Sequence, residues 1–301
     1  MANTKTPLSD EERQRRRTQQ RELVTASVQQ LRSTAGWRRY LATRRAFRSY
    51  SVRNVLLIAM QHPTATRVAG FRAWLKLGYC VRKGETAIRI WAPCPPTNRQ
   101  LKTWRDAGAD PQEKPRTYWK LAAVFAQDQV EPLPPPAEPA ALDEPQPRLA
   151  GDSHGALFAG LVQFADSLGY AMRVEADRHG ADGYCNRRER QIGIATALEP
   201  NARVATAVHE LAHALVGRED VTLTYAQEEL VVESIAYCVC DTLGLDASAA
   251  SVPYLASWAE SAELSVLEQT ATLADKLARQ IEDSLTPLES ARDDPAFARS
   301  A

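Results

Sequence analysis

One stretch of thirteen residues constrains the fold of this chain more than any other. It reads Ala205-Thr-Ala-Val-His-Glu-Leu-Ala-His-Ala-Leu-Val-Gly217, and its small and aliphatic side chains are typical of a mostly buried helix. His209 and His213 are four residues apart, so in a helix their side chains lie one above the other on one face. Two imidazoles at this spacing can bind the same metal ion. The stretch therefore predicts a buried metal-binding helix that ends at Gly217.

Glu210 follows the first histidine directly. From there a carboxylate can approach a metal-bound water rather than the metal, as a general base must. A chance His-Glu-x-x-His is expected in roughly one chain of this length in a hundred. Helical context favours a metal, because two imidazoles on a buried helix each need a hydrogen-bond partner or an ion. Glu210 is thus the candidate catalytic residue.

A catalytic zinc site needs a third protein ligand and an open position for water. The next helix is predicted over residues 228–243, after a capping box at Thr224-Tyr-Ala-Gln227. Glu233 is the predicted ligand, because a carboxylate within Val231-Val-Glu-Ser-Ile-Ala236 would be costly without a cation. Glu229 is expected to support a histidine or to face solvent.

Glu219 occupies the position six residues after the second histidine, where the metzincin pattern has a third histidine. The site is therefore predicted to consist of His209, His213 and Glu233. Either Tyr225 or Tyr237 is a candidate for stabilising an oxyanion. The nearby Arg187, Arg188 and Arg190 are expected to decorate a turn.

The net charge of zero hides two electrostatically opposite halves. Residues 1–125 carry 25 Lys and Arg against 8 Asp and Glu, and residues 126–301 carry 12 against 29. The balances are therefore +17 and −17. A basic module usually binds phosphate, which indicates a nucleic-acid partner for the first half. The alternatives are that the two halves dock on each other, or that the arginines form a solvated face.

Neither a membrane segment nor a disulfide framework is expected. The longest apolar candidate, Val55-Leu-Leu-Ile-Ala-Met60, is far too short to span a bilayer, and no cleavable signal precedes it. The five cysteines form no CxxC pair, and their odd number argues against a set of disulfides. We expect a cytoplasmic protein.

The first domain is predicted over residues 1–130, with helices followed by a small antiparallel sheet. The predicted helices begin at a capping box, Ser9-Asp-Glu-Glu12, and continue at Trp37–Phe47 and Ser51–Gln61. The predicted strands are Ala87–Ala92 and Tyr118–Phe125, joined by a polar loop from Pro93 to Arg116.

The strand at residues 87–92 alternates with period two, so that Arg89 and Trp91 share one face. An aromatic ring beside an arginine suits an unstacked base and its phosphate. The alternative is that Trp91 belongs to the core of the domain.

A linker is predicted over residues 131–150, because seven prolines lie between Pro132 and Pro147. The second domain, residues 151–285, is predicted to be mainly helical with a small sheet, which makes the chain α+β. Its further elements are helices at Gly155–Leu168 and Ala262–Leu285 and strands at Tyr170–Val174 and Gln191–Ile194, with a glycine-marked approach, residues 180–186, before the second strand. An acidic, disordered tail is expected over residues 286–301.

Four segments of the first half resemble the N-terminal domain of the antirestriction protein ArdC, which also occurs in plasmid primases of the TraC type. They are Tyr50–Gln61, Gly70–Gly78, Val81–Glu85 and Val124–Gln129. The resemblance implies single-stranded DNA as the ligand of the basic half. The candidate DNA-binding residues are Arg53, Asn54, Arg72, Trp74, Arg82, Lys83, Arg89 and Trp91.

The second half is similar to the ArdC metallopeptidase domain, which is related to the ImmA/IrrE zincins. The resemblance implies Zn²⁺ held by His209, His213 and a glutamate of the next helix, matched to Glu233, with Glu210 as the catalytic residue. The sequence departs from this family in its longer, proline-rich linker and in the compact segment between the two metal helices.

The predicted function is a single-stranded-DNA-binding protein with a zinc-dependent metallopeptidase domain, which acts on or protects incoming DNA. Its partners would be single-stranded DNA and a protein or peptide substrate, with no membrane. The main alternative is a DNA-shielding protein whose metal site is structural or vestigial. A third hypothesis is an accessory protein of a primase.

Overall fold

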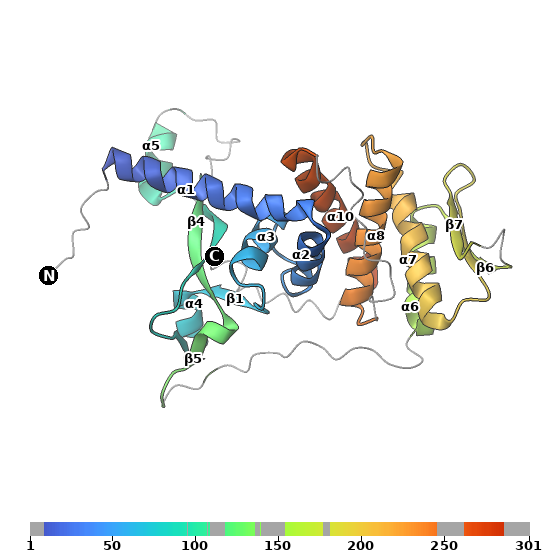
Figure 1. Cartoon of the computed structure of the whole chain (residues 1–301), viewed down its shortest axis with the longest axis horizontal. Coiled ribbons are helices and arrows are strands. Elements are labelled where there is room, and N and C mark those ends of the chain that lie inside the picture. Colours follow the sequence, from blue (N-terminus) through green and yellow to red (C-terminus); the bar gives the residue numbers. More distant parts are fainter. Residues whose placement is uncertain are drawn as a thin grey trace. The chain divides into compact units, whose positions relative to one another are not determined.

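A computed structural model of the chain describes residues 9–94, 96–106, 108, 118–135, 139, 154–176, 181–245 and 262–285 (Figure 1). The chain divides into two compact units. The first unit comprises residues 1–27, 49–141 and 293–301, and the second unit comprises residues 28–48 and 142–292. The predicted linker lies mostly, and the predicted tail entirely, outside the described residues.

The first unit combines helices with small antiparallel sheets, as the sequence predicts. Its helices are α1 (Asp10–Gln29), most of which belongs to this unit, α3 (Val52–Gln61), α4 (Phe71–Lys76) and α5 (Asn98–Asp106). At the start of α1, the Ser9 hydroxyl accepts a hydrogen bond from the Glu12 amide at 3.1 Å. The amphipathic α3 buries its apolar side chains and contacts strand β3.

The main sheet of the first unit has the order β1-β4-β3. Its strands are β1 (Val68–Gly70), β3 (Ile88–Cys94) and β4 (Tyr118–Ala126), all antiparallel. A second antiparallel pair joins β2 (Tyr79–Val81) to β5 (Val130–Pro132). Ile88 and Ile90 are buried on one face of β3, and Arg89 is exposed on the other, which is the predicted alternation.

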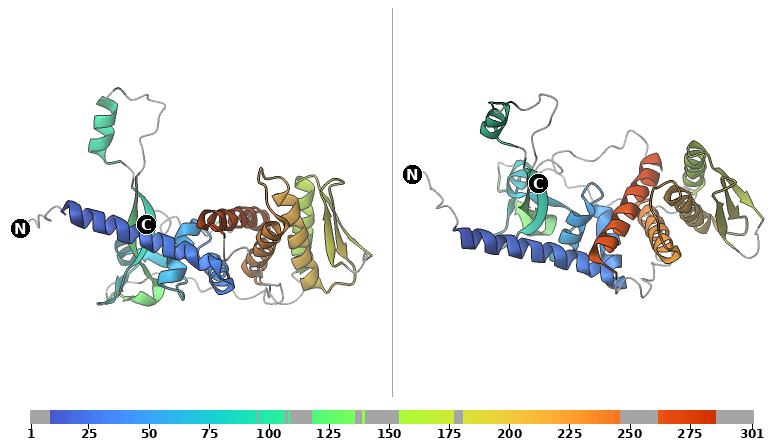
Figure 2. Two further views of the ribbon diagram at one scale, coloured as in Figure 1. Left: turned by 45° about the horizontal axis from the view of Figure 1, so that its top comes forward. Right: turned by 90° about the horizontal axis from the view of Figure 1, so that it is seen from above.

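The sequence predicts a polar loop between β3 and β4. This prediction is wrong in one respect, because the segment contains the helix α5. A capping box starts this helix: the Thr97 amide donates to Gln100 Oε1 at 2.9 Å, and the Gln100 amide donates to Thr97 Oγ1 at 3.3 Å. Both views of Figure 2 show α5 standing away from the strands that it connects. None of its own described residues is buried, so capping and not packing accounts for its local start.

The second unit is mainly helical and contains one small mixed sheet (Figure 1). Its helices are α2 (Thr34–Ala46), α6 (His154–Ser167), α7 (Pro200–Val216), α8 (Tyr225–Thr242) and α10 (Leu264–Leu285). The sheet order is β6-β8-β7, where β6 (Ala171–Glu175) is parallel and β7 (Gly183–Asn186) antiparallel to β8 (Gln191–Ala195). The predicted approach to β8 thus contains a strand of its own, which lies at the sheet edge.

Residues 28–48 group with the second unit, although the predicted first domain spans residues 1–130. Helix α2 lies against α8, where Trp37 Nε1 donates to Ser234 Oγ at 2.9 Å. Against α10, Arg44 Nε donates to Asp275 Oδ1 at 2.7 Å. These buried contacts explain why a segment close to the N-terminus belongs to the mainly helical unit.

No helix in the described part of the chain is both long and apolar enough to cross a bilayer.

Candidate metal centre

Helix α7 carries the two histidines, and it contacts α6, α8, α10, β7 and β8. Pro200 occupies its first turn, as the sequence predicts, and its apolar side chains are buried. The rings of His209 and His213 lie 5.0 Å apart between centroids and 73° apart in plane. One face of the helix therefore presents both imidazoles together, as their spacing predicts.

The carboxylate beside both rings belongs to Glu229 of α8. Glu229 Oε2 lies 3.9 Å from His209 Nε2, and Glu229 Oε1 lies 3.6 Å from His213 Nε2. One ligand atom from each of these three residues lies within 4.8 Å of the other two. These donors, two nitrogens and one carboxylate oxygen, match those that zinc takes in catalytic sites.

The sequence predicts Glu233 as the third ligand. Among the described residues, the carboxylate that lies with the two histidines is that of Glu229, and Glu233 is not part of this group. The sequence argument used the apolar neighbours of Glu233, and burial does raise the pKa of Glu233, with a further contribution from the charge of Glu229. Glu229 lies one helical turn earlier, and there α8 brings a carboxylate to the two rings.

Glu210 is buried, and it does not belong to the group of three ligand atoms. Its pKa is raised to about 7, mainly by burial; His213 opposes this rise, and the charge of Glu229 adds to it. Strand β7 packs closely against α7 at Gly183, where an added Cβ would lie 2.6 Å from Thr206 Cγ2 and 3.0 Å from Glu210 Cγ. A glycine in β7 therefore leaves room for Glu210.

The histidines are suited to bind a cation. Burial, together with the neighbouring His213, lowers the pKa of His209 to about 4. A neutral imidazole has a free nitrogen lone pair, which is the form that binds metals. Burial therefore favours the metal-binding form of His209.

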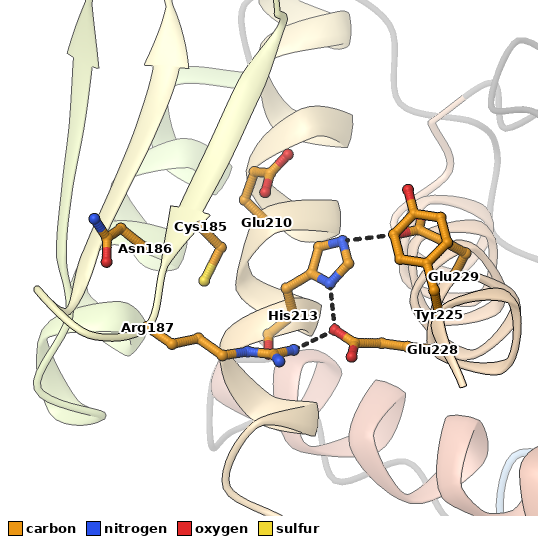
Figure 3. A pocket seen from close by; sticks show the side chains of 8 residues that line it. All are labelled: Cys185, Asn186, Arg187, Glu210, His213, Tyr225, Glu228 and Glu229. Carbon is orange, nitrogen blue, oxygen red and sulfur yellow. Dashed lines mark hydrogen bonds and ion pairs between the residues drawn. The ribbon is translucent and has the colours of Figure 1, made fainter. Parts of the chain in front are cut away.

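Glu228, which precedes Glu229, contacts the other nitrogen of His213 (Figure 3). His213 Nδ1 lies 2.8 Å from Glu228 Oε1, and Arg187 Nη2 also donates to Glu228. Burial raises the pKa of Glu228, but the hydrogen bonds from His213 and Arg187 outweigh it, so the net shift is downward. The sequence predicts Arg187 in a turn, and it predicts that Glu229 either supports a histidine or faces solvent; in the structure Glu228 contacts the second nitrogen of His213.

An open cleft of about 570 Å³ lies over this centre. Its lining residues come from β7 and the turn after it, from α7 and from α8, and they are Cys185, Asn186, Arg187, Glu210, His213, Tyr225, Glu228 and Glu229 (Figure 3). Of the two predicted tyrosines, Tyr225 lines the cleft, and the charge of Glu229 raises the pKa of its phenol. Burial raises the pKa of the Cys185 thiol to about 11.

Two of the predicted DNA-binding residues are structural instead. Asn54 is buried, and its side chain donates to the Trp91 carbonyl at 2.9 Å and accepts from the Trp91 amide at 2.8 Å. Trp74 has 0% of its surface exposed, and its Nε1 donates to the Phe125 carbonyl at 2.9 Å. Both side chains are buried, which argues against their direct contact with a strand of DNA.

The other predicted residues reach the surface. Trp91 is half-buried, and the exposed basic residues are Arg53, Arg72, Arg82, Lys83 and Arg89. Arg82 also donates to Glu85 and to the Asp128 carbonyl, which holds it close to the β2–β3 turn. Their contact with DNA stays a prediction.

Sequence reasoning missed Trp119, which is 62% exposed on β4. Trp91 pairs with Leu121 and Pro93 pairs with Trp119, so Trp119 lies on the same sheet face as Arg89 and Trp91. Side chains alternate between the two faces of β4 as they do in β3. Once the antiparallel pairing of the two strands is known, this alternation identifies Trp119.

The structure thus defines a two-part protein: a unit with small antiparallel sheets, and a helical unit in which a His-Glu-x-x-His helix meets a glutamate of the next helix. Residues 17–125 match the model for the N-terminal domain of the anti-restriction factor ArdC. The predicted resemblance is confirmed for this part of the chain, and the resemblance of the second half to a metallopeptidase stays a prediction.

Three known proteins or structures match a larger part of the chain than residues 17–125. The chain is 27% identical over 251 residues to the uncharacterized protein pXO2-81 of Bacillus anthracis, covering 72% of this chain and 42% of that relative's length. It is also similar to crystal structures of the antirestriction protein ArdC from the R388 plasmid. The Mn(II)-bound structure gives a TM-score of 0.49 at 23% identity, covering 79% of this chain and 86% of the other. The metal-free structure gives 0.49 at 25% identity, covering 78% and 85%.

Proposed function

We propose that the chain is an ArdC-like antirestriction protein with a single-stranded-DNA-binding first unit and a zinc-dependent peptidase centre in its second. The observation that carries the peptidase half is the meeting of His209, His213 and Glu229 beside a separate buried carboxylate, Glu210. A structural metal site has no need for that fourth group.

His209, His213 and Glu229 would hold the ion. When bound, zinc supplies a water of lowered pKa and polarises a substrate carbonyl. Glu210 takes the proton of the attacking water at its carboxylate and returns it to the leaving amine. Burial raises the pKa of Glu210 toward the working pH, where a general acid–base works best.

The edge strand β7 gives a place for an extended peptide. It pairs with β8 on one side, and its residues Cys185 and Asn186 line the cleft. An unpaired strand edge can hydrogen-bond the backbone of an added strand, whatever its side chains are. The proposed substrate is therefore an unfolded or extended segment of protein that passes along β7.

Metal content tests the centre directly. Purified wild-type protein should contain about one zinc per chain, and His209→Ala or His213→Ala should lose it, because two donors hold a catalytic zinc poorly. Elemental analysis after dialysis measures this content. His62→Ala is the matched control, because His62 lies in the first unit and contacts Asp128. Metal-free wild-type protein after growth with zinc would contradict the proposal.

The DNA half rests on the exposed basic residues of the first unit and on the face shared by Arg89, Trp91 and Trp119. Basic side chains neutralise phosphates, and exposed aromatic rings stack on bases. A surface that combines basic side chains with exposed aromatic rings favours binding of single-stranded DNA, whose bases are free to stack.

Trp119→Ala should weaken binding to an oligonucleotide by about 1–3 kcal/mol, because a stacked base loses its partner. The dependence of affinity on salt should stay unchanged. Arg89→Ala should instead reduce the slope of log affinity against log salt by about 1. Fluorescence anisotropy over a salt series measures both, with Trp119→Phe as the variant that keeps an aromatic ring. Unchanged affinity in Trp119→Ala would remove this face from the proposal.

A DNA-shielding protein with a structural or vestigial metal site is the second candidate. It is favoured by one observation: the candidate DNA-binding surface and the metal centre belong to different units and share no residue. Protection of incoming DNA by His209→Ala separates the two. Full protection favours shielding, and lost protection favours peptidase chemistry.

A further inference from the structure

The two ring nitrogens of His213 have different neighbours on α8. Nδ1 lies 2.8 Å from Glu228 Oε1, and Nε2 lies 3.6 Å from Glu229 Oε1 (Figure 3). We propose that Glu228 and Arg187 act as a positioning pair that holds His213 so that its Nε2 nitrogen faces the metal. This inference rests on the proposed metal centre.

The Glu228 contact selects one tautomer of His213. A carboxylate accepts hydrogen bonds, so the imidazole proton lies on Nδ1, and Nε2 keeps its lone pair. The contact also restricts rotation of the ring about the Cβ–Cγ bond, because Nδ1 lies off that axis. A metal-binding histidine that is held in this way loses less freedom when the ion binds, and it is a more basic ligand.

Arg187 ties this carboxylate to the end of α7. Its Nε and Nη2 donate to the His213 carbonyl at 3.0 and 2.7 Å, and Nη2 also donates to Glu228. One guanidinium thus contacts both the backbone of the ligand residue and the carboxylate that orients the ligand ring. A fixed planar fork of donors allows this, and a lysine could not reproduce it.

Gly217 shows how closely Arg187 packs against the end of α7. Its φ of −64° and ψ of −9° are ordinary helical values, so the backbone does not require glycine at this end of α7. An added Cβ would lie 2.6 Å from Arg187 Nε and 2.8 Å from Arg187 Cδ. Glycine at this position therefore leaves space for the arginine, in addition to ending the helix.

The adjacent residues Glu228 and Glu229 of α8 have different roles at the metal centre. Residues next to each other on a helix point about 100° apart, and Glu228 and Glu229 accordingly approach different nitrogens of His213. Glu229 lies near the Nε2 nitrogens of both histidines, and Glu228 contacts the Nδ1 nitrogen of one. The adjacent pair supplies one ligand and one residue that positions a ligand.

The test is zinc affinity of the full-length protein, stripped of metal and titrated against a chromophoric chelator. Glu228→Ala and Arg187→Ala should each weaken zinc binding about 10- to 100-fold. Glu228→Gln should keep much of the affinity, because the amide oxygen still accepts from Nδ1. Arg188→Ala is the matched control, since Arg188 is the exposed neighbour of Arg187, and its affinity should equal that of wild type.

Two further measurements separate positioning from folding. The melting temperature of the metal-free variants should match that of metal-free wild type. The visible spectrum of the Co²⁺-substituted protein should change in Glu228→Ala and return in Glu228→Gln. The double variant Arg187→Ala with Glu228→Ala should lose less affinity than the two single losses predict together, because both act on one ring.

Each outcome has one meaning. If wild type binds zinc and Glu228→Ala binds it equally tightly, the positioning role is overturned while the metal centre stands. If wild type binds none, the metal centre and the positioning pair fall together. Weakened binding by Glu228→Ala with recovery in Glu228→Gln supports the pair.

Discussion

Replacing Glu210 with glutamine should lower the rate of peptide cleavage by about 10²–10⁴-fold and leave the metal content unchanged. Glutamine has almost the same shape as glutamate but cannot accept the proton of an attacking water. Glu210 does not belong to the three-residue metal group, so its charge is not needed to hold the ion. Loss of the carboxylate should therefore affect the reaction much more than metal or DNA binding.

The measurement is proteolysis of an unfolded, fluorescently labelled protein substrate, with and without single-stranded DNA. Metal content and oligonucleotide affinity are measured on the same samples. Glu189→Gln serves as the control, because Glu189 is an exposed carboxylate in the turn after β7. Cleavage by Glu210→Gln at the wild-type rate would assign the catalytic step to another group and would leave the shielding function as the better account.

Local sequence signals identified much of the second unit. The thirteen-residue stretch predicted α7 because its period and its histidine spacing depend only on helix geometry. The capping box of α8 was predicted from Thr224 and Gln227, and the structure has both of its hydrogen bonds. The same rule applied to Thr97 and Gln100 would have identified α5, which the polar composition of that segment hid.

The choice of Glu229 over Glu233 is a tertiary property. The two residues lie one turn apart on α8, so helical periodicity places both on similar faces. Which of them meets the histidines depends on how far α8 is shifted along α7, and the sequence of α8 alone does not contain that shift. Likewise, the burial of Asn54 and Trp74 depends on strands β3 and β4, which lie further along the chain.

The place of residues 28–48 could not be predicted for a related reason. The arginines of helix α2 are part of the basic balance of residues 1–125, from which the sequence predicts a nucleic-acid partner for the first half. Arg44 is instead 1% exposed, and its partners Asp275 and Glu282 lie more than 230 positions later, on α10. An arginine whose carboxylates are so distant in sequence has no local pattern that reveals its burial.

This buried cluster gives the largest expected effect on stability. Arg44 Nε donates to Asp275 at 2.7 Å, and its Nη1 and Nη2 donate to Glu282 at 2.5 and 3.0 Å. Arg44→Met should lower the free energy of unfolding of the second unit by about 3 kcal/mol, because the two buried carboxylates lose their buried cation and keep only the partly exposed Arg279 and Arg48. Methionine keeps most of the volume of the side chain, so the loss reports charge and hydrogen bonding more than a cavity.

Arg45→Met is the matched control on the same helix. Arg45 Nη1 lies 3.2 Å from Asp241 Oδ1, but the Arg45 side chain is 32% exposed, so its ion pair is screened by water. Its loss should cost about 0–1 kcal/mol. Urea unfolding followed by far-UV circular dichroism compares both variants with wild type. The triple variant Arg44→Met, Asp275→Asn, Glu282→Gln should regain part of the loss, because residues 275 and 282 then carry no buried charge, while Arg279 and Arg48 are partly exposed and can be solvated. Equal stability of Arg44→Met and Arg45→Met would mean that residues 28–48 are held to the second unit by apolar packing alone.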